Sequence, residues 1–105
     1  MNEDRTEPVE VRTLAAEPGG RPANFPVAEA ILRYQRRGDG WRGVLTEISP
    51  AGALVEAAYG VVFRDGRTAR IRVTALSPID RRRAYYVGEG DWPGGEREEG
   101  SVDLA

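Results

Sequence analysis

The chain has 105 residues and a net charge of −2, and it contains neither cysteine nor histidine. The missing cysteines exclude disulfides, thiolate zinc sites and thiol nucleophiles, and the missing histidines remove the commonest general base and metal ligand. We therefore expect a protein that is not an enzyme and that needs no metal or cofactor.

Charge is distributed unevenly along the chain, and all of its 15 basic residues are arginine. Residues 25–88 contain eleven arginines and six acidic residues, whereas residues 89–105 contain six acidic residues and one arginine. A basic surface attracts anionic ligands, and an acidic tail can compete for that surface. No apolar run reaches the roughly 20 residues needed to span a bilayer, and the start MNEDRTEPVE is unlike a signal peptide. These features predict a cytoplasmic protein without membrane insertion.

The first third of the chain is predicted to be a flexible arm followed by a strand. Residues 1–24 mix charges with proline and glycine, and only VEVRTL (9–14) alternates as an edge strand would. In FPVAEAILRYQRR (25–37) the apolar residues fit both helical spacing and alternation. The turn-like sequence RRGDGWRG at its end favours a strand.

The rest of the body is predicted to form two hairpins and a last strand. GWRGVLTEI (40–48) and ALVEAA (53–58) would pair around the sequence between them, and YGVVFRDGR would pair with RTARIRVTAL (67–76). The second hairpin turns at Asp65-Gly66, a dipeptide that favours a type I′ turn. RAYYVG (83–88) supplies the final strand. The aromatic side chains expected to pack in the core or at the ends of the barrel are Tyr34, Trp41, Phe63 and Tyr85.

Short strands at roughly ten-residue spacing, with turn residues between them, predict a mainly β fold closed into a small antiparallel barrel. Residues 25–88 would form this domain, and the tail at 89–105 is expected to be disordered because glycine, proline and acidic residues leave little to bury. A domain of this size is marginally stable alone, which favours a bound protein partner or a homo-oligomer.

The loop within LTEISPAGALVEA (45–57) is the strongest candidate for a ligand site. Ser49 can hydrogen-bond a ligand or nearby amides, and Gly52 leaves room for a ligand to approach the backbone. Glu47 lies on the same side of the strand end as Ser49, so a carboxylate and a hydroxyl would act together. The alternative is a connector whose polar groups satisfy only its own backbone.

The segment GVLTEISPAGALVE resembles the second signature of PilZ domains, an Asp/Asn-x-Ser-x-x-Gly loop between the first strands of a six-stranded barrel. FPVAEAILRYQRRGDGW and GRTARIRV resemble the first strand and a later strand of the family, so the similarity covers residues 20–88. Ser49 and Gly52 match the signature, and Glu47 stands where the family has Asp or Asn.

The other signature of the family, Arg-x-x-x-Arg before the first strand, is broken here. GRPANFPV places Gly20 and Asn24 at the two arginine positions, and Arg21 lies one step out of register. The resemblance implies a six-stranded PilZ-like barrel that acts as a regulatory module in a bacterial cytoplasm, either as a cyclic di-GMP receptor or as a protein adaptor. If cyclic di-GMP binds, Arg21 would contact phosphate, and Glu47, Ser49 and Gly52 would shape the guanine end.

A second hypothesis starts from the arginines in the later part of the body, which adjoin two tyrosines. They are Arg64, Arg67, Arg70, Arg72, Arg81, Arg82 and Arg83. Arginines beside aromatic residues suit phosphate pairing and base stacking, so an SH3- or KOW-like barrel could bind RNA or the transcription and translation machinery. The plain alternative is a solvated face whose charges protect strand edges. A third hypothesis is a small inhibitor or immunity-type protein that binds another protein through its acidic tail.

Overall fold

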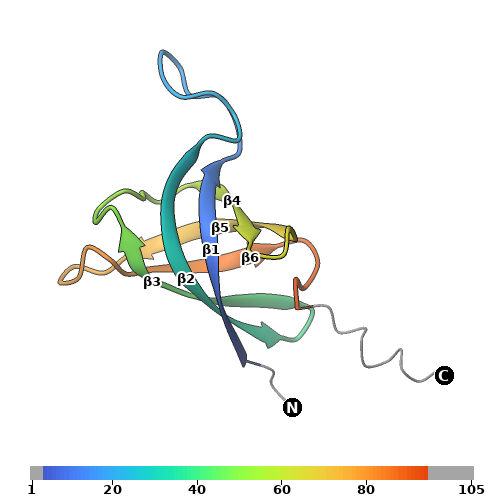
Figure 1. The fold of residues 1–105 in the computed structure, drawn as a ribbon. Helices are drawn as coiled ribbons and strands as arrows, with labels where there is room; N and C mark the ends of the chain where they lie inside the picture. The colour runs from blue at the N-terminus through green and yellow to red at the C-terminus, as the bar shows by residue number, and fades with distance from the viewer. Residues whose placement is uncertain (1–3, 95–105) are drawn as a thin grey trace.

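The computed structural model describes residues 4–94, which form strands and connections without a helix. The strands are β1 (Asp4–Thr13), β2 (Pro26–Arg37), β3 (Gly40–Ser49), β4 (Ala58–Phe63), β5 (Thr68–Leu76) and β6 (Ala84–Glu89). They pair antiparallel in the order β1-β2-β3-β6-β5-β4, and β4 pairs with β1 to close the barrel. The predicted small antiparallel six-stranded barrel is therefore confirmed. Figure 1 shows β1 and β2 running steeply across the strands behind them. Within residues 4–94 no helix could cross a membrane.

Residues 26–37 form a strand, as the turn after them predicts. The buried side chains of β2 alternate with residues that face outward. Those facing the core are Ala28, Ala30, Leu32 and Tyr34. The alternating pattern, and not the helical one, therefore describes how this segment is buried.

The N-terminal segment belongs to the barrel, so the prediction of a flexible arm is wrong for residues 4–13. β1 pairs with β2 along its length and with β4 over its second half. Val9 and Val11 are buried in the core. The segment looks too polar for a core strand because only one of its faces is buried, and charged residues occupy the other.

The hairpin predicted for residues 40–58 is also wrong, because β3 and β4 are not neighbours. β3 pairs with β2 and β6, and β4 pairs with β1 and β5. Residues 50–57 therefore form a connection between separated strands. Turn residues in the sequence cannot predict this pairing, because one of the two strands that pair with β4 is β1, at the start of the chain.

The β4–β5 hairpin is confirmed, but its turn differs from the predicted one. The amide of Phe63 donates to the carbonyl of Arg67 at 2.8 Å, and the amide of Gly66 donates to that of Phe63 at 2.9 Å. Within this three-residue loop only Gly66 has a positive φ, 97°. A type I′ turn needs two such residues, so this is a type I turn that ends in a left-handed glycine.

Aromatic side chains fill the end of the barrel at which β6 ends. Tyr34 is fully buried, and its ring makes edge-to-face contacts with Trp41 and Phe63 at centroid distances of 6.2 and 5.9 Å. The ring of Trp92 lies 5.1 Å from that of Tyr34. Tyr85, by contrast, is 41% exposed, so its predicted place in the core is wrong; its neighbour in the sequence faces inward instead.

The expected disorder of residues 89–105 is wrong for the first part of that segment. Glu89 ends β6, and Trp92 packs against the core. The indole Nε1 of Trp41 donates to the carbonyl of Gly90 at 3.2 Å. Residues 95–105 lie outside the described residues.

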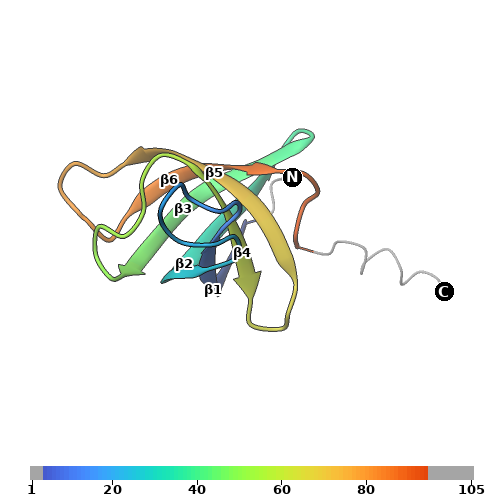
Figure 2. The ribbon, with the colours of Figure 1, turned by 90° about the horizontal axis from the view of Figure 1, so that it is seen from above.

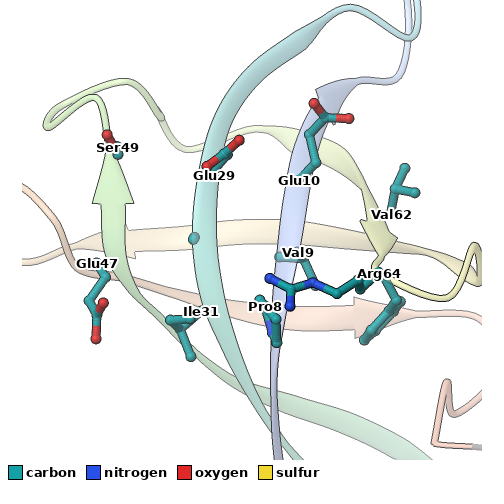
Figure 3. Close-up of a pocket in the computed structure, with 11 residues that line it drawn as sticks. Pro8, Val9, Glu10, Glu29, Ile31, Glu47, Ser49, Val62 and Arg64 are labelled. Atoms are coloured by element: carbon teal, nitrogen blue, oxygen red, sulfur yellow. The ribbon is translucent and has the colours of Figure 1, made fainter.

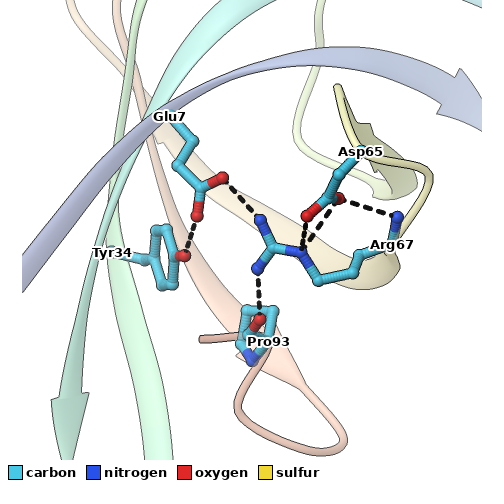
Figure 4. A network of polar contacts seen from close by, with 5 residues as sticks. All are labelled: Glu7, Tyr34, Asp65, Arg67 and Pro93. Atoms are coloured by element: carbon cyan, nitrogen blue, oxygen red, sulfur yellow. Dashed lines mark hydrogen bonds and ion pairs between the residues drawn. The ribbon is translucent and has the colours of Figure 1, made fainter. Parts of the chain in front are cut away.

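A polar network closes the same end of the barrel (Figure 4). The guanidinium of Arg67 donates to Glu7 at 2.5 Å and to the carbonyl of Pro93 at 2.6 Å, and it pairs with Asp65 at 2.8 Å. The hydroxyl of Tyr34 donates to the other oxygen of Glu7. The network thus joins β1, β2, the β4–β5 turn and the segment after β6.

This environment makes the stability of the fold sensitive to alkaline pH. Burial, followed by the hydrogen bond to Glu7, raises the pKa of Tyr34 to about 12, and burial also raises the pKa of Tyr86. The unfolded chain releases these protons near pH 10, about two units below the pKa of folded Tyr34. The stability that Tyr34 contributes is therefore complete below about pH 10 and is lost as the pH rises through about 12.

We expect the free energy of unfolding to be constant from about pH 8 to 9.5, because the chain has no lysine, histidine or cysteine side chain to titrate there. Above about pH 10 it should fall by about 1.4 kcal/mol per pH unit for each of the two tyrosines. Urea titrations at several pH values measure this slope. The Tyr34→Phe variant is the matched control and should retain only the slope due to Tyr86. An unchanged slope in that variant would contradict the assignment.

Candidate binding surface

The loop predicted as a ligand site is held by the connection between β5 and β6. The amide of Gly52 donates to the carbonyl of Arg81 at 2.9 Å, and the amide of Ile48 donates to that of Arg82 at 3.1 Å. The guanidinium of Arg82 donates a hydrogen bond to the carbonyl of Ile48 at 3.0 Å. The structure therefore brings the Ser-Pro-x-Gly loop and two of the predicted arginines together, with Arg82 as a structural contact.

Gly52 is needed for this contact. Its φ is +75°, and a Cβ atom there would overlap the guanidinium of Arg81. Within residues 4–94 Arg81 makes no ion pair, whereas Arg83 lies 3.9 Å from a carboxylate oxygen of Asp80. The glycine therefore serves packing between two loops of this chain, which is the connector alternative for this position.

Glu47 and Ser49 are turned outward by a bulge in β3. The pairing with β2 shifts between Glu29 and Ile31, and Glu47 adopts a positive φ of 55°. The extra residue lets the strand bury Ile48 while Glu47 and Ser49 both remain exposed. Both polar groups thus lie outside the barrel, but a bulge places them there, and not the regular alternation from which the prediction was made.

The surface beside these two residues is acidic. They border an open depression of about 490 Å³ on the outside of the barrel (Figure 3). The charged side chains that line it are Glu10, Glu29, Glu47 and Arg64. Glu10 is paired with Arg12 at 2.7 Å, so Glu29 and Glu47 beside Arg64 leave one excess carboxylate, and this potential does not favour phosphate groups.

Arg21, the predicted phosphate ligand, lies in the connection between β1 and β2, which projects from the barrel (Figure 1) and crosses in front of it when seen from above (Figure 2). Its guanidinium pairs with Glu17 at 2.9 Å and lowers the pKa of that carboxyl by a hydrogen bond. Among residues 4–94, no hydrogen bond or ion pair joins Arg21 to Glu47, Ser49 or Gly52. The structure does not assemble the four predicted ligand residues into one site.

The seven arginines predicted to bind RNA occupy four different settings. Arg64 lines the acidic depression, and Arg67 belongs to the network at the barrel end, with its guanidinium 4.4 Å from the centroid of the Phe63 ring. Arg70 and Arg72 lie on the outside of β5, where both approach Glu89, at 3.9 and 3.2 Å. The arginines at 81–83 lie in the β5–β6 connection.

Strand register assembles a different surface, on the outside of β3, β6 and β5. From β2 to β5, one row of paired residues is Arg33, Val44, Tyr85 and Ala75, and the next is Gln35, Arg42, Val87 and Arg72. Tyr85 and Val87 are 41% and 40% exposed. We call Arg42, Val44, Arg72, Tyr85 and Val87 the Tyr85–Val87 face.

No protein-family model matches the chain, and no curated protein or solved structure matches it either. Within the described part of the chain, no group of acidic, cysteine or histidine side chains could hold a metal ion. What the barrel binds must therefore be inferred from its own surfaces.

The Tyr85–Val87 face combines an apolar centre with basic flanks. Val87 lies between Arg42 and Arg72, one on each neighbouring strand. Arg72 is paired with Glu89, whereas Arg42 makes no ion pair within residues 4–94.

Sequence reasoning missed this face, although part of its signal was present. Alternation in RAYYVG places Tyr85 and Val87 on one side of the strand. Which side faces solvent depends on the partner strands, and these come from distant parts of the chain.

Proposed function

We propose that this protein is a non-enzymatic adaptor module of the cytoplasm that binds a partner protein through the Tyr85–Val87 face. The observation that carries the proposal is an exposed aromatic and aliphatic pair at the centre of three paired strands, with Val87 between Arg42 and Arg72 and Tyr85 between Val44 and Ala75. A closed barrel offers no free strand edge, so a partner cannot add a strand to it and would bind to side chains instead. Aromatic and arginine residues dominate the binding energy of protein interfaces.

The chemistry of the face favours a partner segment in which acidic residues lie beside aliphatic ones. Arg42 and Arg72 would pair with carboxylates, and Tyr85 and Val87 would bury an aliphatic side chain. RNA is the weaker candidate, because single strands stack on aromatic residues and gain little from Val87. Cyclic di-GMP is disfavoured by the acidic depression beside Glu47. The resemblance to PilZ domains stays a prediction.

Binding of a short fluorescent peptide in which glutamate and leucine alternate tests the proposal. We expect this peptide to bind the full chain, and Tyr85→Ala to weaken its affinity by about 30-fold, as an interface hot spot of about 2 kcal/mol would. Arg42→Gln should weaken it by about five- to tenfold and should reduce its dependence on salt. Fluorescence anisotropy titrations at two salt concentrations measure both effects.

Two controls separate the face from general electrostatic attraction. Arg64→Gln removes an exposed arginine from the acidic depression, on a different part of the barrel surface, and should leave the affinity unchanged. A peptide in which glutamate and serine alternate has the same charge and should bind much more weakly. Equal affinity of the Tyr85→Ala and Arg64→Gln variants, or tight binding of an oligouridine in place of the peptide, would overturn the adaptor proposal.

A further inference from the structure

We infer that a second copy of this chain docks on the Tyr85–Val87 face, and that it does so with the depression on the outside of its own barrel. The inference rests on the proposed function, because it uses the same face. It adds an occupant for that face: copies of the chain associate head to tail, and an external partner has to compete with them.

The depression has the chemistry that the face favours, which is acidic residues beside aliphatic ones. Glu29 and Glu47 line it from β2 and β3, and neither makes an ion pair with another of residues 4–94 (Figure 3). Ile31 and Val62 supply half-buried aliphatic side chains. A hollow of about 490 Å³ has room for side chains that project from another surface.

The charges left unpaired on the two surfaces have opposite signs. On the face, Arg72 is paired with Glu89, whereas Arg42 is exposed and makes no ion pair with another described residue. The depression retains one excess carboxylate after its own arginines are counted. The contact therefore places Arg42 beside Glu29 or Glu47, where a guanidinium and a carboxylate form a charge-assisted hydrogen bond.

The apolar residues of the two surfaces fit the same contact. Tyr85 projects from the outside of β6, and Val44 and Val87 lie beside it. Ile31 and Val62 are the aliphatic side chains that these residues would cover in the depression. Removing apolar area from water on both surfaces supplies affinity that a single exposed ion pair lacks.

The two surfaces lie on opposite sides of the barrel. In the closed order β1-β2-β3-β6-β5-β4, the strand β1 runs through the depression and is three places from β6 in either direction. Figure 1 accordingly shows β1 crossing in front of β6. One copy therefore cannot fill its own depression, and two copies cannot make both contacts at once. A contact between different surfaces of identical chains then continues into an open row of copies.

Two variants, each with one surface disabled, test the inference. Tyr85→Ala removes the centre of the face, and Glu29→Arg reverses a charge in the depression. Each should weaken association by about 30-fold or more, as the loss of an interface hot spot does. The mass of the unsubstituted protein should rise steadily with its concentration, whereas each variant alone should remain a monomer. Sedimentation velocity at up to about 1 mM protein measures these masses, because a contact with so few ion pairs is weak and transient.

An equimolar mixture of the two variants gives the sharpest result. The intact face of the Glu29→Arg variant should dock in the intact depression of the Tyr85→Ala variant, so a dimer forms. It should grow no further, because both of its free surfaces carry a substitution. The dimer also shows that each variant is folded. In a mixture in which only the Tyr85→Ala variant is isotope-labelled, the amide signals of Ile31 and Val62 should shift and that of Val44 should not.

Glu56→Arg is the matched control for charge. It makes the same change in net charge as Glu29→Arg, at an exposed position in the connection between β3 and β4. It should associate as the unsubstituted protein does. Three results would overturn the inference: a mixture that stays monomeric, association that persists in either variant alone, or growth of the unsubstituted protein that stops at a dimer.

The two proposals can fail separately. If the unsubstituted protein stays monomeric and the glutamate-leucine peptide still binds in a Tyr85-dependent manner, self-association is wrong and the adaptor function stands. If rows of copies form and the peptide neither binds nor disperses them, the adaptor proposal is wrong and self-association stands.

Discussion

We expect Tyr34→Ala to lower the free energy of unfolding by about 3–5 kcal/mol, the usual cost of removing a large aromatic side chain from a core. Tyr34 is fully buried, and its ring lies within 6.2 Å of the ring centroids of Trp41, Phe63 and Trp92. Its loss would leave a cavity at the point where three separate segments meet. A small domain has about 5–15 kcal/mol of stability in total, so the variant should be close to unfolding at 25 °C.

Urea unfolding followed by tryptophan fluorescence measures this loss, since Trp41 and Trp92 both contact the deleted ring. Tyr34→Phe keeps the ring and removes only the hydrogen bond to Glu7, so it should cost about 1 kcal/mol. Tyr85→Ala is the matched surface control and should change stability by less than about 1 kcal/mol, because that ring lies outside the barrel. A similar cost for Tyr34→Ala and Tyr85→Ala would contradict the described core.

Gly88→Ala is the second substitution from which we expect a large effect, a loss of about 2–3 kcal/mol. A Cβ atom at Gly88 would overlap the indole ring of Trp41. The indole cannot easily move aside, because it packs edge-to-face against Tyr34 and Tyr86 and donates a hydrogen bond to Gly90. Forcing extra volume into such a packed site usually costs about 1–3 kcal/mol.

The direction of this change in the free energy of unfolding is informative. In the interior of a strand, alanine is normally more stable than glycine by about 0.5–1 kcal/mol, because glycine loses more conformational entropy on folding. Gly40→Ala is the matched control, since the nearest atom to a Cβ there is the carbonyl oxygen of Arg37 at 3.8 Å. Thermal unfolding should show a lower midpoint for Gly88→Ala and an unchanged or higher one for Gly40→Ala. A stabilised Gly88→Ala variant would show that Trp41 does not pack on β6.

The strands and their buried faces were largely predictable because they depend on local chemistry. Alternation predicts that Ile71 and Val73 share one side of β5, and both are buried. The Asp65-Gly66 pair predicts the hairpin between β4 and β5 because a glycine is needed for the left-handed position of its turn. The predicted type of this turn was nevertheless wrong, because the turn type depends on the hydrogen-bond register between β4 and β5.

The candidate site was less predictable than the fold. Ser49 and Gly52 were found from their residue types, yet their neighbours in space are Glu29 across the strand pair and Arg81 across the loops. Neither neighbour follows from the spacing of the motif. A Ser-x-x-Gly loop could border either a phosphate site or an acidic depression. The charged residues on the adjoining strands determine which of the two is formed.

The sequence by itself determined that the chain forms short antiparallel strands with a basic body, because side-chain alternation, turn residues and charge are local properties. Only the tertiary structure decided that β1 closes the barrel, that β3 pairs with β6, and that Tyr86 rather than Tyr85 faces the core. The physical reason is that alternation divides a strand into two faces without saying which one is buried. That choice is made by contacts between strands far apart in the chain, and it places Tyr85 and Val87 on the outside, with Val87 between two arginines.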